Sequence, residues 1–100
     1  MELASVHVRL YGVFRSAAKT SELQVSVPEE NPTVKTVIAH LTSNDANSNI
    51  KELLLDSETL DPRPNALIMV SGREISSLNG LETRVSPRDE MALLPVAHGG

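Results

Sequence analysis

The sequence predicts an α+β domain in which a mixed β-sheet packs on one main α-helix. Near both ends of the chain, apolar residues alternate with polar residues, as they do in half-buried strands. Between these regions, one segment changes to the three-to-four-residue spacing of an amphipathic helix. The predicted order is strand, strand, helix, strand, short strand, strand. One helix beside several strands indicates a single sheet with helical cover.

The first two strands are predicted over residues 6–11 and 23–27. In the first, apolar side chains stand at every second position, at Val6, Val8 and Leu10. The second repeats this pattern and ends at Pro28, which cannot donate a ladder hydrogen bond. Residues 15–21 are small and polar, so we expect a hairpin connection between the two strands.

The main helix is predicted to begin after Thr33, a residue type that caps helix N-termini. Its apolar stripe follows the i, i+3, i+4, i+7 spacing and consists of Val34, Val37, Ile38 and Leu41. The polar residues 43–49 end this helix. Residues 50–55 are expected to form a short second helix.

The second half of the chain predicts three more strands. Residues 60–65 contain two prolines and form a connector, and the apolar run 66–70 is typical of a central strand covered on both faces. Ser71 and Gly72 predict a tight turn into a short strand at 73–75. We expect an irregular loop at 78–85, a turn at 87–89 and the last strand at 90–94.

Composition excludes several classes of function. The chain has 100 residues, a net charge of −4, two aromatic residues and no cysteine. A basic face with stacking rings is therefore missing, which argues against direct nucleic-acid binding. No apolar run is long enough to span a membrane and no secretory signal opens the sequence, so we expect a soluble cytoplasmic protein.

No residue pattern predicts a bound metal or cofactor. Without cysteine the chain has no thiolate ligand or thiol nucleophile. His7 and His40 lack the spacing of a metal or acid–base pair and are expected at ordinary surface positions. There is no phosphate-binding glycine-rich loop, so any ATP used would bind to a partner protein.

The chain ends in Gly99-Gly100, directly after the apolar run 91–98. A dipeptide without Cβ atoms can enter a narrow cleft and adopt almost any φ and ψ. A partner enzyme could therefore present the terminal carboxylate to the α-phosphate of ATP. We predict one domain over residues 1–95 and a flexible tail over 96–100. The alternative is a frayed terminus without function.

The C-terminal third carries a resemblance to a known family. The segments that match are residues 67–75, 80–83 and 89–96, followed by the Gly-Gly ending. Their order and spacing resemble the MoaD/ThiS family of ubiquitin-like sulfur carriers, which includes the ubiquitin-related modifiers and the small archaeal modifier proteins. The resemblance covers nearly the whole chain and implies the β-grasp, or ubiquitin-like, fold.

Four positions depart from the family pattern. Ser71 stands where the family often has asparagine, and Arg88 where it usually has glycine; both concern turns. Val96 and His98 depart from the Pro-Pro-(small)-Gly-Gly ending common in molybdopterin synthase small subunits. The ending His98-Gly99-Gly100 is instead similar to that of the ubiquitin-related modifiers. This favours tRNA thiolation or protein modification over molybdenum cofactor synthesis.

The resemblance implies a mechanism in which this chain is a carrier and not an enzyme. An adenylating enzyme of the ubiquitin-activating type would consume ATP and transfer AMP to Gly100, and persulfide sulfur would then leave a thiocarboxylate. Alternatively, a lysine amine would capture the activated tail as an isopeptide. His98 would contact the activating enzyme. Other implied partners are a sulfur donor or sulfurtransferase, a tRNA-thiolating enzyme, the large subunit of molybdopterin synthase and lysines of target proteins.

Strand alternation also predicts a docking surface. One helix covers only one face of a sheet, and resemblance to ubiquitin places Ile68, Val70, Met91 and Leu93 beneath it. An apolar patch for a partner would then remain on the other face, formed by Leu67, Met69, Ala92 and Leu94. Alternatively, the connector 57–65 could cover this patch.

Two further functions remain open at this point. The chain could be the non-catalytic small subunit of a stable molybdopterin synthase heterodimer. It could also be a passive ubiquitin-like interaction module whose Gly-Gly ending is never activated.

Overall fold

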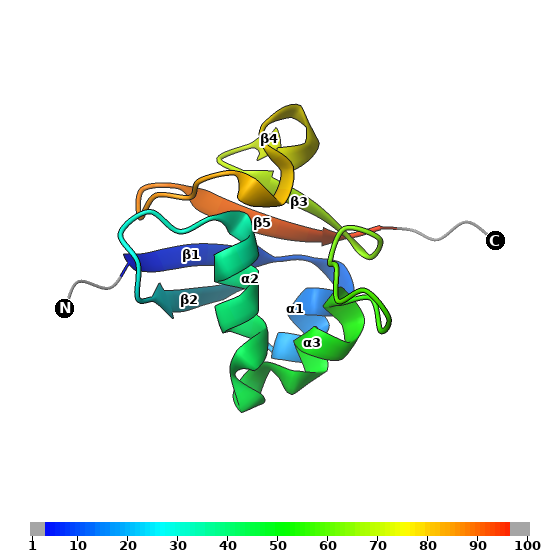
Figure 1. Cartoon of the computed structure of the whole chain (residues 1–100). Coiled ribbons are helices and arrows are strands. Elements are labelled where there is room, and N and C mark those ends of the chain that lie inside the picture. Colours follow the sequence, from blue (N-terminus) through cyan, green and yellow to red (C-terminus); the bar gives the residue numbers. More distant parts are fainter. Residues whose placement is uncertain (1–3, 97–100) are drawn as a thin grey trace.

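The computed structural model describes residues 4–96 and confirms the α+β, β-grasp architecture (Figure 1). Five strands form one mixed sheet in the order β2-β1-β5-β3-β4. Their bounds are Ala4–Leu10 for β1, Glu22–Val27 for β2, Ala66–Val70 for β3, Arg73–Glu74 for β4 and Glu90–Pro95 for β5. β1 and β5 are parallel, and every other pair is antiparallel. The strand nearest the C-terminus is therefore the central one.

Three helices lie on the same side of this sheet (Figure 1). They are α1 (Gly12–Ala18), α2 (Val34–Ser43) and α3 (Ser48–Leu54), and short 3₁₀ turns occupy Asp45–Asn47, Ile75–Ser77 and Gly80–Glu82. α2 is the predicted main helix, and the Thr33 side chain caps it by accepting a hydrogen bond of 3.2 Å from the Thr36 N–H. α3 is the predicted short second helix, beginning two residues earlier than expected.

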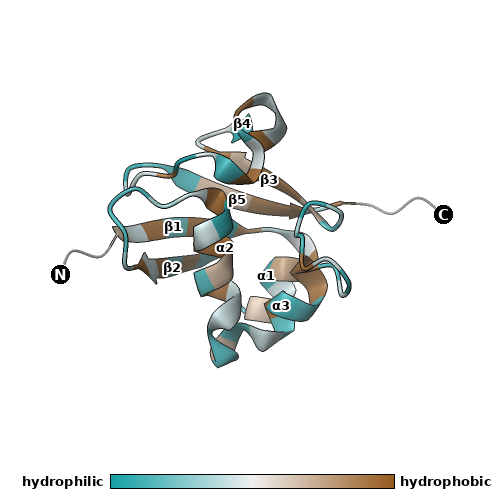
Figure 2. Cartoon of the chain, in the orientation of Figure 1, coloured by the Kyte–Doolittle hydropathy of each residue, from teal (hydrophilic) through white to brown (hydrophobic). Residues whose placement is uncertain are grey.

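The core lies between the helices and the face of the sheet that they cover. Val6, Val8 and Leu10 of β1 are buried, and so are Met91 and Leu93 of β5. From α2, the whole predicted stripe is buried as well. Figure 2 shows hydrophobic colour along β3 and β5 and hydrophilic colour in much of the loops.

The connection between β1 and β2 differs from the prediction. The two strands do pair as a hairpin, but residues 12–18 between them form helix α1 and not a simple turn. Phe14 explains the helix, because its ring is 1% exposed and belongs to the core. Lys19 ends α1 in the left-handed conformation, with φ 60°. Burial of one aromatic side chain stabilises a helix too short to persist alone.

The apolar run in β3 is also placed differently from the prediction. β3 lies between β5 and the short edge strand β4, so it is not the central strand. Its burial alternates, since Ile68 is 1% exposed whereas Leu67 is 40% exposed. The helices cover only one face of the sheet, so a continuous apolar run here leaves half of its side chains on an open face.

Candidate functional site

The C-terminal residues predicted to react lie outside the described part of the chain. His98, Gly99 and Gly100 belong to residues 97–100, which the structure does not describe. The described parts of the candidate site are the base of the tail, where β5 ends, and the open face of the sheet beside it.

The base of the tail is attached to the domain by Asn65. The Val96 N–H donates a hydrogen bond of 3.0 Å to the Asn65 carbonyl, one residue beyond the end of β5. The Asn65 side chain donates from Nδ2 to the Leu54 carbonyl, at 3.1 Å, where α3 ends. Asn65 therefore joins the first residue of the predicted tail to a helix on the other side of the core.

A second contact at the tail base involves Gly12 and Pro95. Gly12 has φ +54°, and a Cβ atom placed on it would lie 2.6 Å from Cγ of Pro95. The adjacent Tyr11 N–H donates to the Leu93 carbonyl at 3.2 Å. Only glycine allows the start of α1 to approach β5 this closely. The direction in which the chain leaves the sheet is thus set by Gly12 and Asn65, neither of which the sequence analysis singled out.

The predicted patch lies on the face of the sheet that the helices leave open. Ile68, Val70, Met91 and Leu93 are buried beneath the helices. On the other face, Leu67 is exposed and the remaining patch residues are half-buried, namely Met69, Ala92 and Leu94. The strand register places Leu67 opposite Leu94 and Met69 opposite Ala92, so the four side chains adjoin.

Part of the connector lies away from this patch, since Thr59, Leu60, Asp61 and Pro62 line a groove with residues of α2 and α3 on the helical side of the sheet. Arg63 of the connector lines a hollow together with Leu67, which stays 40% exposed. The role of the patch in docking stays a prediction.

Charged residues flank the patch in one row across the sheet. By register, the row runs from Glu22 on β2 through Arg9 on β1, Ala92 on β5 and Met69 on β3 to Glu74 on β4. Arg9 is held by two carboxylates, at 2.7 Å from Glu22 and 3.5 Å from Glu90. An apolar centre with a charged rim is the composition of a protein interface.

His7 lies beside this ion-pair cluster. Its Nε2 atom is shielded from solvent and makes no hydrogen bond, although Oε1 of Glu22 is 3.5 Å away. Among residues 4–96, no group of three or more His, Cys, Asp or Glu side chains is arranged to hold a metal ion. Nothing in the described chain places His7 next to His40.

The turns where the sequence departs from the family pattern contact each other. The Ser71 hydroxyl donates a hydrogen bond of 2.8 Å to Oδ1 of Asp89, and Oδ2 of Asp89 accepts one of 2.8 Å from the Ser86 N–H. The hydrogen bond from the Ser86 backbone holds the pKa of the Asp89 carboxyl below its usual range, with a smaller contribution from Ser71. This contact joins the β3–β4 turn to the loop before β5.

Comparison with known proteins identifies the family. The model of the ThiS family matches residues 8–100 of the chain. The chain belongs to the ThiS family. This ThiS-family protein is therefore a ubiquitin-like protein of the sulfur-carrier and modifier kind. No curated protein shows significant similarity to it.

Solved structures of similar proteins share the fold. The small archaeal modifier protein 1 of Methanosarcina acetivorans is 31% identical, with a TM-score of 0.80 and full coverage of both chains. The same protein from Haloferax volcanii is 19% identical, with a TM-score of 0.78 over 96% of this chain and 99% of that one. A chain of the BexX/CysO complex of Amycolatopsis orientalis is 23% identical, with a TM-score of 0.70 over 95% and 99%.

No helix within residues 4–96 is both long and apolar enough to cross a bilayer.

Proposed function

We propose that this ThiS-family protein is a carrier whose C-terminal glycine is activated by adenylation and then loaded with sulfur or joined to a lysine. The observation that carries the proposal is the position of Gly99-Gly100 at the end of a family match that extends through residue 100. The similarity to a small archaeal modifier protein, at 31% identity over the whole chain, supports the same function.

Activation is required because a carboxylate is a poor electrophile. The α-carboxyl group has a pKa of about 3.5 and is ionised at neutral pH. One of its oxygens attacks the α-phosphorus of ATP on a ubiquitin-activating-type partner, and pyrophosphate leaves. The acyl-adenylate that results has AMP as a good leaving group.

Sulfur transfer then follows in two balanced steps. The terminal sulfur of a persulfide on the sulfurtransferase displaces AMP and forms an acyl disulfide with Gly100. A second thiol attacks the enzyme's sulfur atom of that disulfide, releases the thiocarboxylate and leaves an enzyme disulfide. This chain has no cysteine, so both thiols come from partners. If a lysine amine displaces AMP instead, the product is an isopeptide.

The domain contributes position and recognition, not catalysis. Fully extended, residues 96–100 span about 17 Å, enough to enter the active site of a neighbouring protein. Asn65 and Gly12 fix the point from which this span begins. The patch of Leu67, Met69, Ala92 and Leu94 provides the docking surface, and His98 contacts the activating enzyme near the reacting group.

The test uses the full-length protein with ATP and the activating enzyme encoded in the same genome. We expect pyrophosphate release and an acyl-adenylate on Gly100, followed by the mass change of one oxygen replaced by sulfur once a persulfide donor is added. An adenylate without a change in mass would limit the proposal to protein modification. If no adenylate forms, the passive interaction module is the better account. Tight copurification with a larger molybdopterin synthase subunit would favour the heterodimer alternative.

A further inference from the structure

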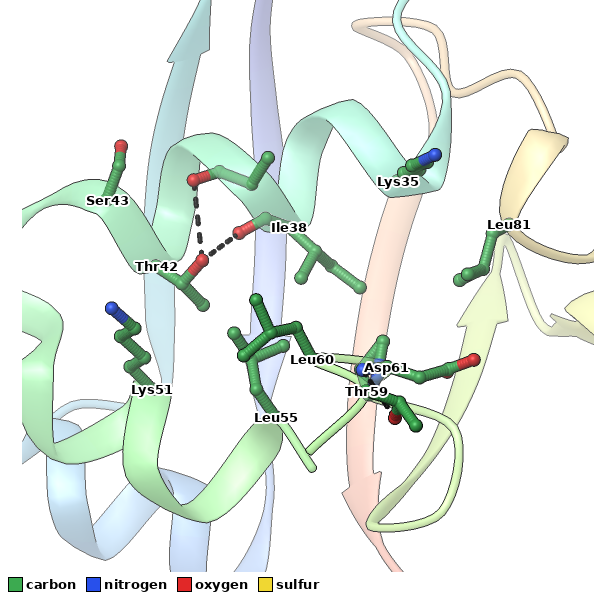
Figure 3. A pocket seen from close by; sticks show the side chains of 12 residues that line it. Lys35, Ile38, Thr42, Ser43, Lys51, Leu55, Thr59, Leu60, Asp61 and Leu81 are labelled. Atoms are coloured by element: carbon green, nitrogen blue, oxygen red, sulfur yellow. Dashed lines mark hydrogen bonds between the residues drawn. The ribbon is translucent and has the colours of Figure 1, made fainter. Parts of the chain in front are cut away.

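A groove on the helical side of the molecule lies far from the open face of the sheet. It has a volume of ≈ 500 Å³ and runs between α2, α3 and the segment 59–62 (Figure 3). Its walls are largely apolar and include Ile38, Ala39, Leu55, Leu60 and Leu81. Because the groove and the patch of Leu67, Met69, Ala92 and Leu94 lie on opposite sides of the sheet, both can be occupied at once.

Leu60 is held in this groove in an unfavourable conformation. Its φ is 61°, in the left-handed region, and its side chain is 63% exposed. Adopting this region is unfavourable for a residue with a Cβ atom, because Cβ comes too close to the following carbonyl oxygen. In Figure 3 the Leu60 side chain extends into the space between Thr42 and Leu55.

The loop around Leu60 is fixed by hydrogen bonds. The Leu60 N–H donates to the Asp56 carbonyl at 2.8 Å, and Oδ2 of Asp56 accepts from the Thr59 and Glu58 N–H groups at 2.9 and 3.1 Å. The loop thus keeps a large apolar side chain at the groove, mostly exposed, at a conformational cost. Such strain is typical of sites that bind a ligand or partner.

Two lysines give the groove a positive rim. The chain has three lysines, and two of them, Lys35 on α2 and Lys51 on α3, line the groove from separate helices (Figure 3). Neither makes an ion pair with any residue between 4 and 96. The carboxylate in the groove, Asp61, is paired with Arg63 at 2.6 Å. In a protein of net charge −4, this surface therefore attracts carboxylates locally.

We propose that this groove docks an amphipathic, acidic segment of a partner protein. Leucine-like side chains of that segment pack against Leu60, and its carboxylates pair with Lys35 and Lys51. Apolar anchors in a groove with charges at its rim form the helix-in-groove mode of recognition. The groove is open to solvent, with Leu60 63% exposed in its wall, and this favours a peptide segment over a small molecule that would be enclosed. The proposal does not depend on activation of Gly100.

The test uses the full-length protein, labelled for NMR, and a synthetic peptide of about 15 residues, roughly four helical turns. One face of the peptide carries leucines flanked by glutamates, and a second peptide has lysines in place of the glutamates. We expect amide shifts in α2, α3 and residues 56–62 with the acidic peptide, and much weaker binding of the basic one. Equal binding of both peptides, or shifts confined to β3 and β5, would overturn the proposal.

Variants of the protein separate the contribution of the two lysines to binding from that of Leu60. The double change Lys35→Glu and Lys51→Glu should raise the Kd by about tenfold, since two exposed ion pairs with the peptide, each of modest strength, are lost. Lys19→Glu makes the same charge change at the end of α1, away from the groove, and should leave the Kd unchanged. If Lys19→Glu weakens binding as much, only net charge matters and the site is wrong.

Leu60→Gly separates binding from folding. Glycine relieves the positive φ, so the variant should unfold at the same temperature or higher, yet bind the acidic peptide more weakly. Unchanged affinity would remove Leu60 from the proposed site.

Decanoate serves as a small-molecule probe of the same groove. Saturation of the groove by decanoate, with no binding of the acidic peptide, would replace the peptide with a small amphiphile and overturn the proposal.

Discussion

Gly12 approaches Pro95 so closely that a Cβ atom on residue 12 would lie 2.6 Å from Cγ of the proline. This contact joins the start of α1 to the last residue of β5. Two elements separated by most of the chain therefore meet where the C-terminal residues leave the sheet.

Gly12→Ala should destabilise the protein by about 2–4 kcal/mol. Roughly 1–2 kcal/mol comes from the positive φ and the rest from the clash with Pro95. Urea unfolding of Gly80→Ala provides the matched control, because Gly80 has φ +59° and its nearest neighbour would be 3.9 Å away. Adding Pro95→Ala to Gly12→Ala should recover the difference between the two glycine variants. Equal losses at Gly12 and Gly80 would show that the contact has no energetic role.

The double variant Met69→Lys and Leu94→Lys should weaken docking of the activating enzyme by about tenfold or more and leave the fold intact. Both side chains lie on the open face, where loss of apolar contact affects a partner and not the core. As a control, Gln24→Lys adds a single positive charge at an exposed position on β2 and should have little effect. Binding is measured by calorimetry and folding by circular dichroism. Unfolding of the double variant would place these side chains in the core.

Removal of Gly100 should abolish adenylation while changing the free energy of unfolding by less than about 0.5 kcal/mol. The carboxylate of the shortened chain would end one residue short of the α-phosphate. Gly99→Val should act similarly, because its side chain cannot enter a cleft shaped for glycine. Ala97→Gly keeps the length and adds no bulk, so it serves as the control in the same pyrophosphate-release assay. Normal adenylation of the shortened chain would contradict the proposed function.

Asp89 should make stability depend on pH in the acidic range. Its folded-state pKa is lowered, chiefly by the Ser86 N–H. Its contribution is therefore complete above the usual pKa of aspartate, about 4, and is lost as pH falls through the lower folded-state value. Asp89→Asn should reduce stability at neutral pH and flatten the acid limb of the stability curve. As a control, Asp45→Asn removes the same charge from an exposed position. If Asp89→Asn leaves the acid limb unchanged, the Asp89 carboxylate does not contribute to the pH dependence of stability.

The sequence pattern predicts the elements whose side chains follow a regular period. Alternation in β1 and β2 and the stripe of α2 locate these elements within a few residues, and Thr33 marks the first turn of α2 correctly. Alternation also separates the buried Ile68 from the exposed Leu67. These patterns involve residues that are close in sequence, so they predict the elements without knowledge of the tertiary structure.

What the pattern misses depends on contacts between distant residues. α1 is only seven residues long, so its helical period is weak, and it forms because Phe14 is buried in the core. A usable signal was present, since Phe14, Ala17 and Ala18 have helical spacing. Asn65 lay in a segment interpreted as a connector, and no local feature reveals its bonds to Val96 and Leu54.

The central position of β5 has a mechanical consequence. β5 is bonded along one edge to β1 and along the other to β3. A partner that grips the C-terminal residues and pulls along the strand loads both rows of hydrogen bonds in shear, so they resist the force together instead of opening one after another. The tail can therefore be drawn into an active site under tension while the domain remains folded.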